Sequence, residues 1–136
     1  MKKSDQDALA LEWFERADTD IELAISLLRR KEFPTATAFH AQQGAEKYLK
    51  GLLVWHGKDI KDQFKIHSLA RLFKFALALD RRLSEEARIA AVSLDRYYVD
   101  TRYPGDVEEY TRADVASAVA AAEIIRDDIL KLTTAQ

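Results

Sequence analysis

The stretch that decides the fold is residues 39–55, FHAQQGAEKYLKGLLVW. At 100° per residue, a helix here gathers its apolar residues on one side. That side comprises Ala38, Ala41, Ala45, Tyr48, Leu49, Leu52, Trp55 and His56. The opposite side carries His40, Gln43, Lys47 and Lys50, with Gly44 and Gly51 beside them. We therefore expect a central helix whose apolar side packs in the core and whose polar side contacts another group.

The two glycines of this helix indicate a close neighbour. A glycine inside a helix costs roughly 0.5–1 kcal/mol relative to alanine. Gly44 and Gly51, seven residues apart, therefore predict that another backbone comes near this side. Three interpretations of the polar side stay open: a solvated face, a contact with another helix or with a second copy of the chain, and a direct ligand site.

Composition limits the class of protein. The chain has 136 residues, enough for one domain with its own core, and we predict a single domain over residues 1–136. It contains no cysteine, which excludes thiolate catalysis, cysteine zinc sites and disulfides. A net charge of −2 argues against a protein that coats nucleic acid non-specifically, because such binding needs a basic excess.

The expected location is the cytoplasm. The sequence holds no run of about 18 apolar residues, so we predict no membrane span and no membrane partner. Its first ten residues, MKKSDQDALA, lack the apolar core that follows the lysines of a signal peptide.

The hydrophobic pattern predicts an all-α fold. Helical spacing of apolar residues extends over 4–31, 34–56, 69–79, 85–97 and a last segment opened by Thr111 or Asp114. Pro34 suits the first turn of the central helix, while Ser68 and Ser84 are expected N-caps. Short links make neighbouring helices antiparallel. We predict an up-and-down bundle of four main helices plus one short helix.

Histidines and lysines supply the first candidate chemistry. Spacings of three and four bring His40, Gln43, Lys47 and Lys50 together as donors for a phosphate or a carboxylate. His67 precedes the third helix, where a capping or hydrogen-bonding role is the usual one. The histidines lack metal-ligand spacing, and His40 and His56 lie about 24 Å apart along one helix. We predict no metal and no cofactor.

The irregular segment 98–110 is the second candidate region. It reads YVDTRYPGDVEEY and contains Arg102 beside Tyr103. A guanidinium can fork onto a phosphate, and tyrosine rings offer stacking surfaces for bases. The alternative is that the tyrosines plug the end of the bundle while Arg102 pairs with Asp100, Asp106 or Glu109.

Four stretches together resemble one known family. WFERADTDIELAISLL, FHAQQGAEKYLKGLL, HSL and YYVDTRYP follow the order found in the HEPN family (higher eukaryotes and prokaryotes nucleotide-binding). The resemblance extends from about Trp13 to Ile129. It implies a four-helix bundle, commonly a homodimer, often encoded with a minimal nucleotidyltransferase in a toxin–antitoxin-like module. Many members are metal-independent ribonucleases with an R-x4–6-H motif.

The chain departs from that motif. Arg102 lies where the arginine of the motif is expected, but no histidine follows it, and Asp106, Val107, Glu108 and Glu109 fill the next positions instead. The loop therefore lacks the acid/base group, which is typically worth about 100- to 10,000-fold in rate. If the chain is an enzyme, we expect an endoribonuclease with Arg102, His40 or His67 as candidate catalytic residues.

The leading prediction is binding rather than catalysis. We expect a HEPN-type homodimer that contacts a nucleotide, an RNA or a nucleotidyltransferase through His40, Gln43, Lys47, Lys50, Arg102 and Tyr103. The two alternatives are a ribonuclease toxin and a non-catalytic subunit of a nucleotidyltransferase.

Overall fold

The structure, a computed structural model, describes residues 1–61, 66–98 and 110–134. Within these ranges the chain forms helices and no strand. The helices are α1 (Lys3–Arg30), α2 (Pro34–Trp55), α3 (Leu69–Leu79), α4 (Glu85–Leu94), the short 3-10 helix η1 (Asp95–Tyr97) and α5 (Arg112–Thr134). The predicted all-α bundle is confirmed. Three of the α-helices are long and two are short, whereas four main helices and one short helix were expected. The fourth helix is shorter than expected because it ends at Leu94, where the chain tightens into η1.

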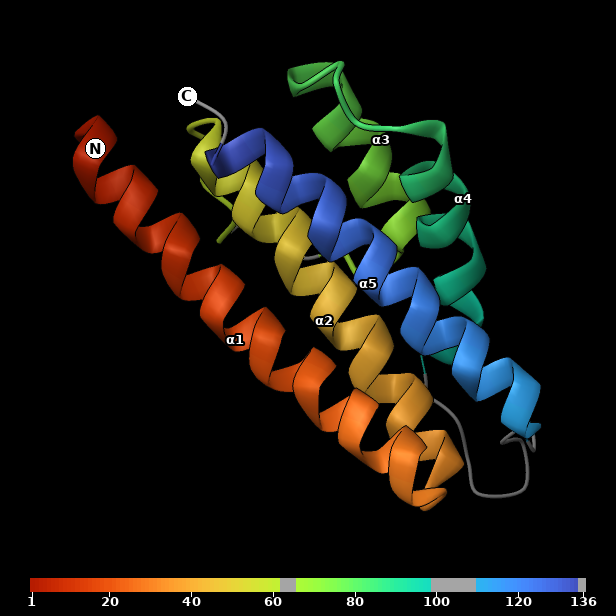
Figure 1. Cartoon of the computed structure of the whole chain (residues 1–136). Coiled ribbons are helices and arrows are strands. Elements are labelled where there is room, and N and C mark those ends of the chain that lie inside the picture. Colours follow the sequence, from red (N-terminus) through yellow and green to blue (C-terminus); the bar gives the residue numbers. More distant parts are fainter. Residues whose placement is uncertain (62–65, 99–109, 135–136) are drawn as a thin grey trace.

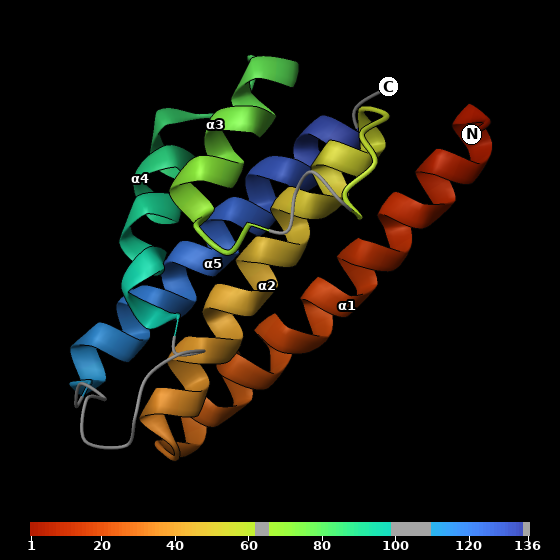
Figure 2. The ribbon, with the colours of Figure 1, turned by 180° about the vertical axis from the view of Figure 1, so that it is seen from behind.

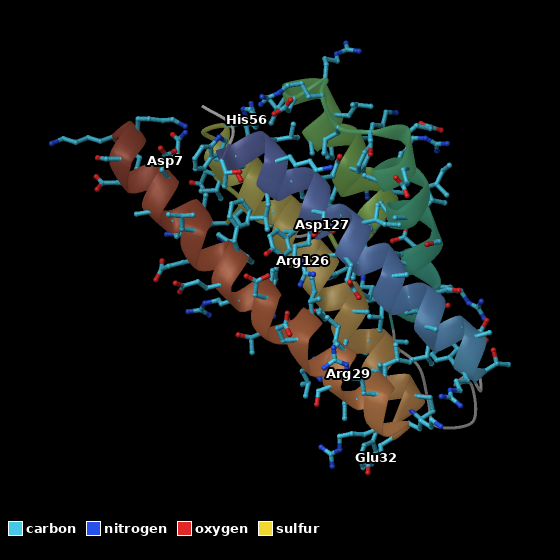
Figure 3. The ribbon with its side chains drawn as sticks, in the orientation of Figure 1. Asp7, Arg29, Glu32, His56, Arg126 and Asp127 are labelled. Carbon is cyan, nitrogen blue, oxygen red and sulfur yellow. The ribbon has the colours of Figure 1, made fainter. Side chains whose placement is uncertain are left out.

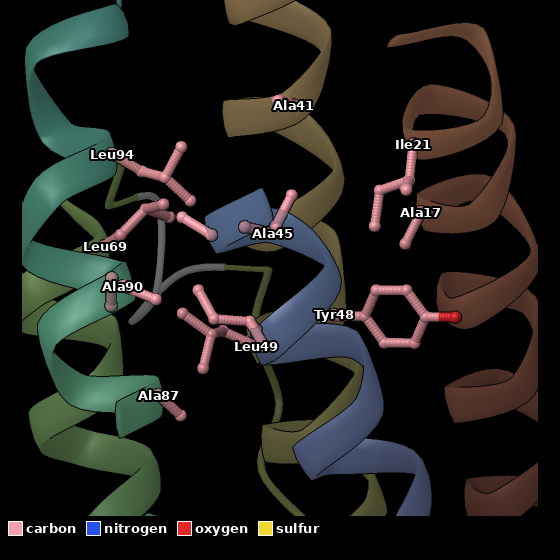
Figure 4. Packing of buried hydrophobic residues seen from close by; sticks show 14 of the residues in the cluster. Ala17, Ile21, Ala41, Ala45, Tyr48, Leu49, Leu69, Ala87, Ala90 and Leu94 are labelled. Atoms are coloured by element: carbon pink, nitrogen blue, oxygen red, sulfur yellow. The ribbon is translucent and has the colours of Figure 1, made fainter. Parts of the chain in front are cut away.

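Helix α2 is the centre of the bundle. Helices α1 and α5 lie along two of its sides, and α3 and α4 pack beside α2 and α5 on the side away from α1 (Figure 1). Figure 4 shows how the core divides around α2: Tyr48 points toward α1, whereas Leu49 points toward α4. Both side chains are fully buried. In the described part of the chain, no helix is long and apolar enough to cross a membrane.

Local signals fix the helix ends as expected. The backbone of Lys31 and of Phe33 is left-handed (φ 58° and 50°), and Pro34 opens α2. The side chains of Ser68 and Ser84 accept hydrogen bonds from Arg71 N and Ala87 N, at 3.3 and 3.0 Å. These N-caps confirm the predicted starts of α3 and α4.

The last helix begins with a reciprocal cap. Thr111 and Asp114 exchange two hydrogen bonds, from Thr111 N to Asp114 Oδ2 at 2.9 Å and from Asp114 N to Thr111 Oγ1 at 3.1 Å. Both candidates for this helix start therefore contribute, in the manner of a capping box.

The glycines of α2 face α1 of the same chain. An ideal Cβ on Gly44 would lie 2.4 Å from Ile21 Cγ1 and 3.1 Å from Ala17 O, and one on Gly51 would lie 2.5 Å from Phe14 Cε1. The predicted close neighbour is thus an intrachain helix, and α1 reaches α2 only because both positions lack a side chain.

The end of α2 carries an ion-paired histidine. His56, expected on the apolar side, is half-buried and places Nε2 3.1 Å from Asp80 Oδ2. The Arg82 guanidinium, which donates two hydrogen bonds to the same carboxylate, lowers the pKa of Asp80 to about 2. This cluster joins the end of α2 to the corner between α3 and α4.

We expect the substitution Gly44→Ala to destabilise the protein. Overpacking against Ile21 costs roughly 1–3 kcal/mol, and the gain in helix propensity returns about 1 kcal/mol. Urea unfolding should therefore show a net loss of up to about 2 kcal/mol. In an Ile21→Ala background the obstructing Cγ1 is gone, so the same substitution should be nearly neutral. An equal loss in both backgrounds would contradict the close approach.

Candidate functional site

The polar face of α2 comprises His40, Gln42, Gln43, Glu46, Lys47 and Lys50. It lies on the side of α2 between α1 and the segment 66–68 that leads into α3 (Figure 2). His40, Gln43 and Lys47 are partly exposed, whereas Lys50, expected at an open contact, is buried at 9% exposure. The face is therefore bounded on both sides by other parts of the chain.

Asp20 of α1 holds one edge of this face. One carboxylate oxygen lies 2.9 Å from His40 Nδ1, and the other accepts a hydrogen bond from Lys47 Nζ at 2.5 Å. Asp20 is buried while both partners are partly exposed. A carboxylate at Nδ1 fixes the orientation of the imidazole and directs Nε2 away from it.

Glu46 holds the other edge in the same way. Its side chain lies 3.1 Å from Lys50 Nζ and 3.3 Å from His67 Nδ1. Glu46 is 4% exposed, and the side chain of His67 is half exposed. The His67 ring also stacks on Tyr98, with centroids 4.7 Å apart and planes 13° from parallel. His67 is thus fixed by a carboxylate at one nitrogen and by a ring on one face.

Two amides connect the edges. Gln43 donates to Gln42 Oε1 at 2.7 Å, and Gln42 donates to the backbone carbonyl of His67 at 3.3 Å. Gln42 is fully buried. These bonds tie segment 66–68 to α2.

The charges of the polar face compensate one another. Lys47 pairs with Asp20 and Lys50 pairs with Glu46. With both imidazoles neutral, the cluster carries no net charge. The two lysines therefore do not form the free basic patch that their spacing predicted, and the groups left to meet a ligand are the imidazole edges and Gln43.

A hollow of about 480 Å³ adjoins this face between α1 and α2. Its lining comprises Leu9, Glu12, Trp13, Arg16, Thr19, Asp20 and Lys47. The Asp20–Lys47 pair belongs to both the hollow and the polar face. A ligand on the face therefore has room to extend along α1.

Arg102 and Tyr103 lie outside the described residues. The residues before and after their segment are well anchored. Tyr97 is buried and its hydroxyl donates to the carbonyl of Asp114 at 3.2 Å, and Tyr110 donates likewise to the carbonyl of Arg96 at 3.3 Å. Tyr97 and Tyr110 thus pack edge to face beside the start of α5, whereas Tyr98 lies beside the polar face of α2 through its stack on His67.

Sequence reasoning missed Asp20, Glu46 and Gln42. Each is a polar residue beside the apolar stripe of its helix, and each is buried. The sequence did contain a signal for Glu46, because it lies four residues before Lys50, a spacing at which the two side chains can form an ion pair on a helix. For Asp20 no local signal exists, because its partners lie 20 and 27 residues away.

Metal ligation has no geometric support in the described ranges, where no group of three or more histidine, aspartate or glutamate side chains is arranged to hold an ion. The carboxylates near the histidines instead accept hydrogen bonds from the imidazoles and lysines.

Comparison with known proteins decides the family. A family model described as the HEPN domain matches residues 10–132. The chain belongs to the HEPN domain family. Its fold is similar to TT1696 from Thermus thermophilus, with 30% identity, a TM-score of 0.76, and coverage of 90% of this chain and 96% of that one. It is also similar to ST0689, an archaeal HEPN homologue, with 25% identity, a TM-score of 0.69, and coverage of 91% and 97%. No curated protein matches.

We expect Asp20→Ala to destabilise this HEPN protein by about 2–3 kcal/mol, because it leaves His40 and Lys47 partly buried without their shared acceptor. The matched control is Glu22→Ala on the same helix. Glu22 pairs with Arg126 of α5 (labelled in Figure 3) at 3.3 Å, but its side chain is 68% exposed. Removing it should cost less than about 0.5 kcal/mol in urea unfolding. Similar losses for the two variants would show that Asp20 is an ordinary surface partner.

Proposed function

We propose that this HEPN protein binds a nucleotide or an RNA on the polar face of α2, together with Arg102 and Tyr103 of the adjoining segment. The observation that carries the proposal is the pair of imidazoles, His40 and His67, each fixed through Nδ1 by a buried carboxylate on one surface.

The chemistry of the face suits a phosphorylated ligand. Each fixed imidazole directs Nε2 toward a ligand, where it donates when protonated and accepts when neutral. Gln43 adds an amide of the kind that reads a base edge. Arg102 would supply the phosphate contact that the compensated lysines do not, and Tyr103 would supply a stacking surface.

We further propose that the chain forms a homodimer and that this dimer binds a second protein. In the described part of the chain, both lysines of the polar face are paired with carboxylates. A second copy would bring a second Arg102 to this face and so supply positive charge for a phosphate. A minimal nucleotidyltransferase, in a toxin–antitoxin-like module, is the proposed partner. A gene for such an enzyme beside this one would support the pairing, and its absence would count against it.

Titration with ATP, GTP and a short RNA tests the binding proposal. We expect Arg102→Ala to weaken binding at least tenfold, because a charge-assisted hydrogen bond to phosphate is worth about 1.5–3 kcal/mol. His40→Ala should weaken binding by less, because a neutral His40 offers the ligand only a neutral hydrogen bond, worth about 0.5–1.5 kcal/mol. The matched control is Arg81→Ala, an exposed arginine at the corner between α3 and α4, which should bind as the wild type does. Negligible binding of all ligands to the wild type would remove the proposal.

A metal-independent endoribonuclease is the second candidate. The observation in its favour is again the carboxylate at each imidazole, since an acid or base that moves protons during RNA cleavage needs such orientation. His40 and His67 would exchange the protons, with Arg102 at the phosphate. The missing histidine after Arg102 is the observation against it.

Expression of the chain alone in bacteria distinguishes the two functions. A ribonuclease should arrest growth and degrade RNA, and His40→Ala, His67→Ala or Arg102→Ala should restore growth, whereas Arg81→Ala should not. Cleavage by the purified protein should persist in a metal chelator. Intact RNA and normal growth with the soluble wild type would eliminate the enzyme and leave the binding function.

A further inference from the structure

A second, separate cavity lies where three helices meet. It has a volume of about 160 Å³ at the end of α1 and the starts of α2 and α5. Its lining comprises Leu27, Leu28, Lys31, Glu32, Pro34, Thr37, Tyr110, Arg112 and Val115. None of these residues belongs to the polar face of α2, so the cavity is not part of the site proposed above.

The walls of this cavity are mostly apolar. Leu27 and Leu28 come from α1, Pro34 from α2 and Val115 from α5. The two buried residues of the lining with hydroxyl groups already have partners. The Thr37 hydroxyl lies 3.2 and 2.9 Å from the carbonyl oxygens of Glu32 and Phe33, and the Tyr110 hydroxyl donates to the carbonyl of Arg96 at 3.3 Å. The interior therefore suits a hydrocarbon body that needs no hydrogen bond.

The turn between α1 and α2 leaves the cavity unfilled. Phe33 is the largest apolar side chain in that turn, yet it is 65% exposed and absent from the lining. Its left-handed backbone, with φ of 50°, is a costly conformation for a bulky residue. The Phe33 ring therefore points away from the cavity and does not fill it.

The rim of the cavity is positively charged. Lys31 and Arg112 are both exposed, and neither forms an ion pair with any residue of the described ranges. The one carboxylate in the lining, Glu32, lies 3.2 Å from Arg30. The lining therefore contains two cations that have no ion-pair partner in the described ranges, which favours an anionic group on the ligand.

We propose that this cavity binds a small organic carboxylate with a body about the size of one ring. An apolar cavity of about 150 Å³ is large enough for benzene, which sets the size of the body. The carboxylate would lie between Lys31 and Arg112, and the ring would contact Leu28, Pro34 and Val115.

Backbone-amide NMR with benzoate as the probe tests this site. We expect saturable shifts at Leu28, Thr37 and Val115 with a dissociation constant on the order of 1 mM, as suits a ligand of about nine heavy atoms. Arg112→Gln and Lys31→Gln, which change only exposed side chains, should each weaken benzoate about five- to tenfold. The control Arg81→Gln should leave the affinity unchanged.

A neutral analogue of benzoate separates the contribution of the apolar cavity from that of the two cations. Benzyl alcohol should enter the same cavity, and its weaker binding should not respond to Arg112→Gln. Absence of benzoate shifts around the cavity, or equal effects of Arg112→Gln and Arg81→Gln, would overturn the proposal. Nucleotide binding on the polar face is measured separately, so either result can fail without the other.

Discussion

The contact between α1 and the glycine side of α2 is the constraint on which the rest of the structure depends. Ile21 packs on Gly44 and Phe14 packs on Gly51, at distances that leave no room for a Cβ. Asp20 directly precedes Ile21, so the same contact brings its carboxylate to the polar face of α2. Without the close approach of α1, neither His40 nor Lys47 would have a fixed partner.

Burial of two carboxylates then sets the character of the site. Asp20 and Glu46 are almost wholly removed from water, which is costly for a charge unless hydrogen bonds compensate it. Each finds one lysine and one imidazole. A helix side that would otherwise be a basic patch becomes a neutral surface with two oriented imidazoles. Affinity for phosphate must then come from other groups, which gives Arg102 and a second copy their proposed importance.

Much of the fold could be predicted from the sequence because its signals are local. Proline, serine and threonine mark the helix starts, and Gly44 and Gly51 indicated a near backbone. The site was predicted less completely. His40, Lys47 and His67 each contact a buried carboxylate, and these contacts depend on tertiary packing between residues 20 or more positions apart. Lys50 was expected at a contact and is buried beside Glu46.

The most direct test of this account is the tautomer of each imidazole, measured by nitrogen-15 NMR of the neutral side chains at a pH above about 8, where an ordinary imidazole has lost its proton. His40 and His67 meet their carboxylates through Nδ1, whereas His56 meets Asp80 through Nε2 and serves as an internal control. The account predicts that His40 and His67 carry their proton on Nδ1 and that His56 carries it on Nε2. Finding His40 and His67 protonated on Nε2 would contradict it, because neither imidazole could then donate to the buried carboxylate that is said to orient it.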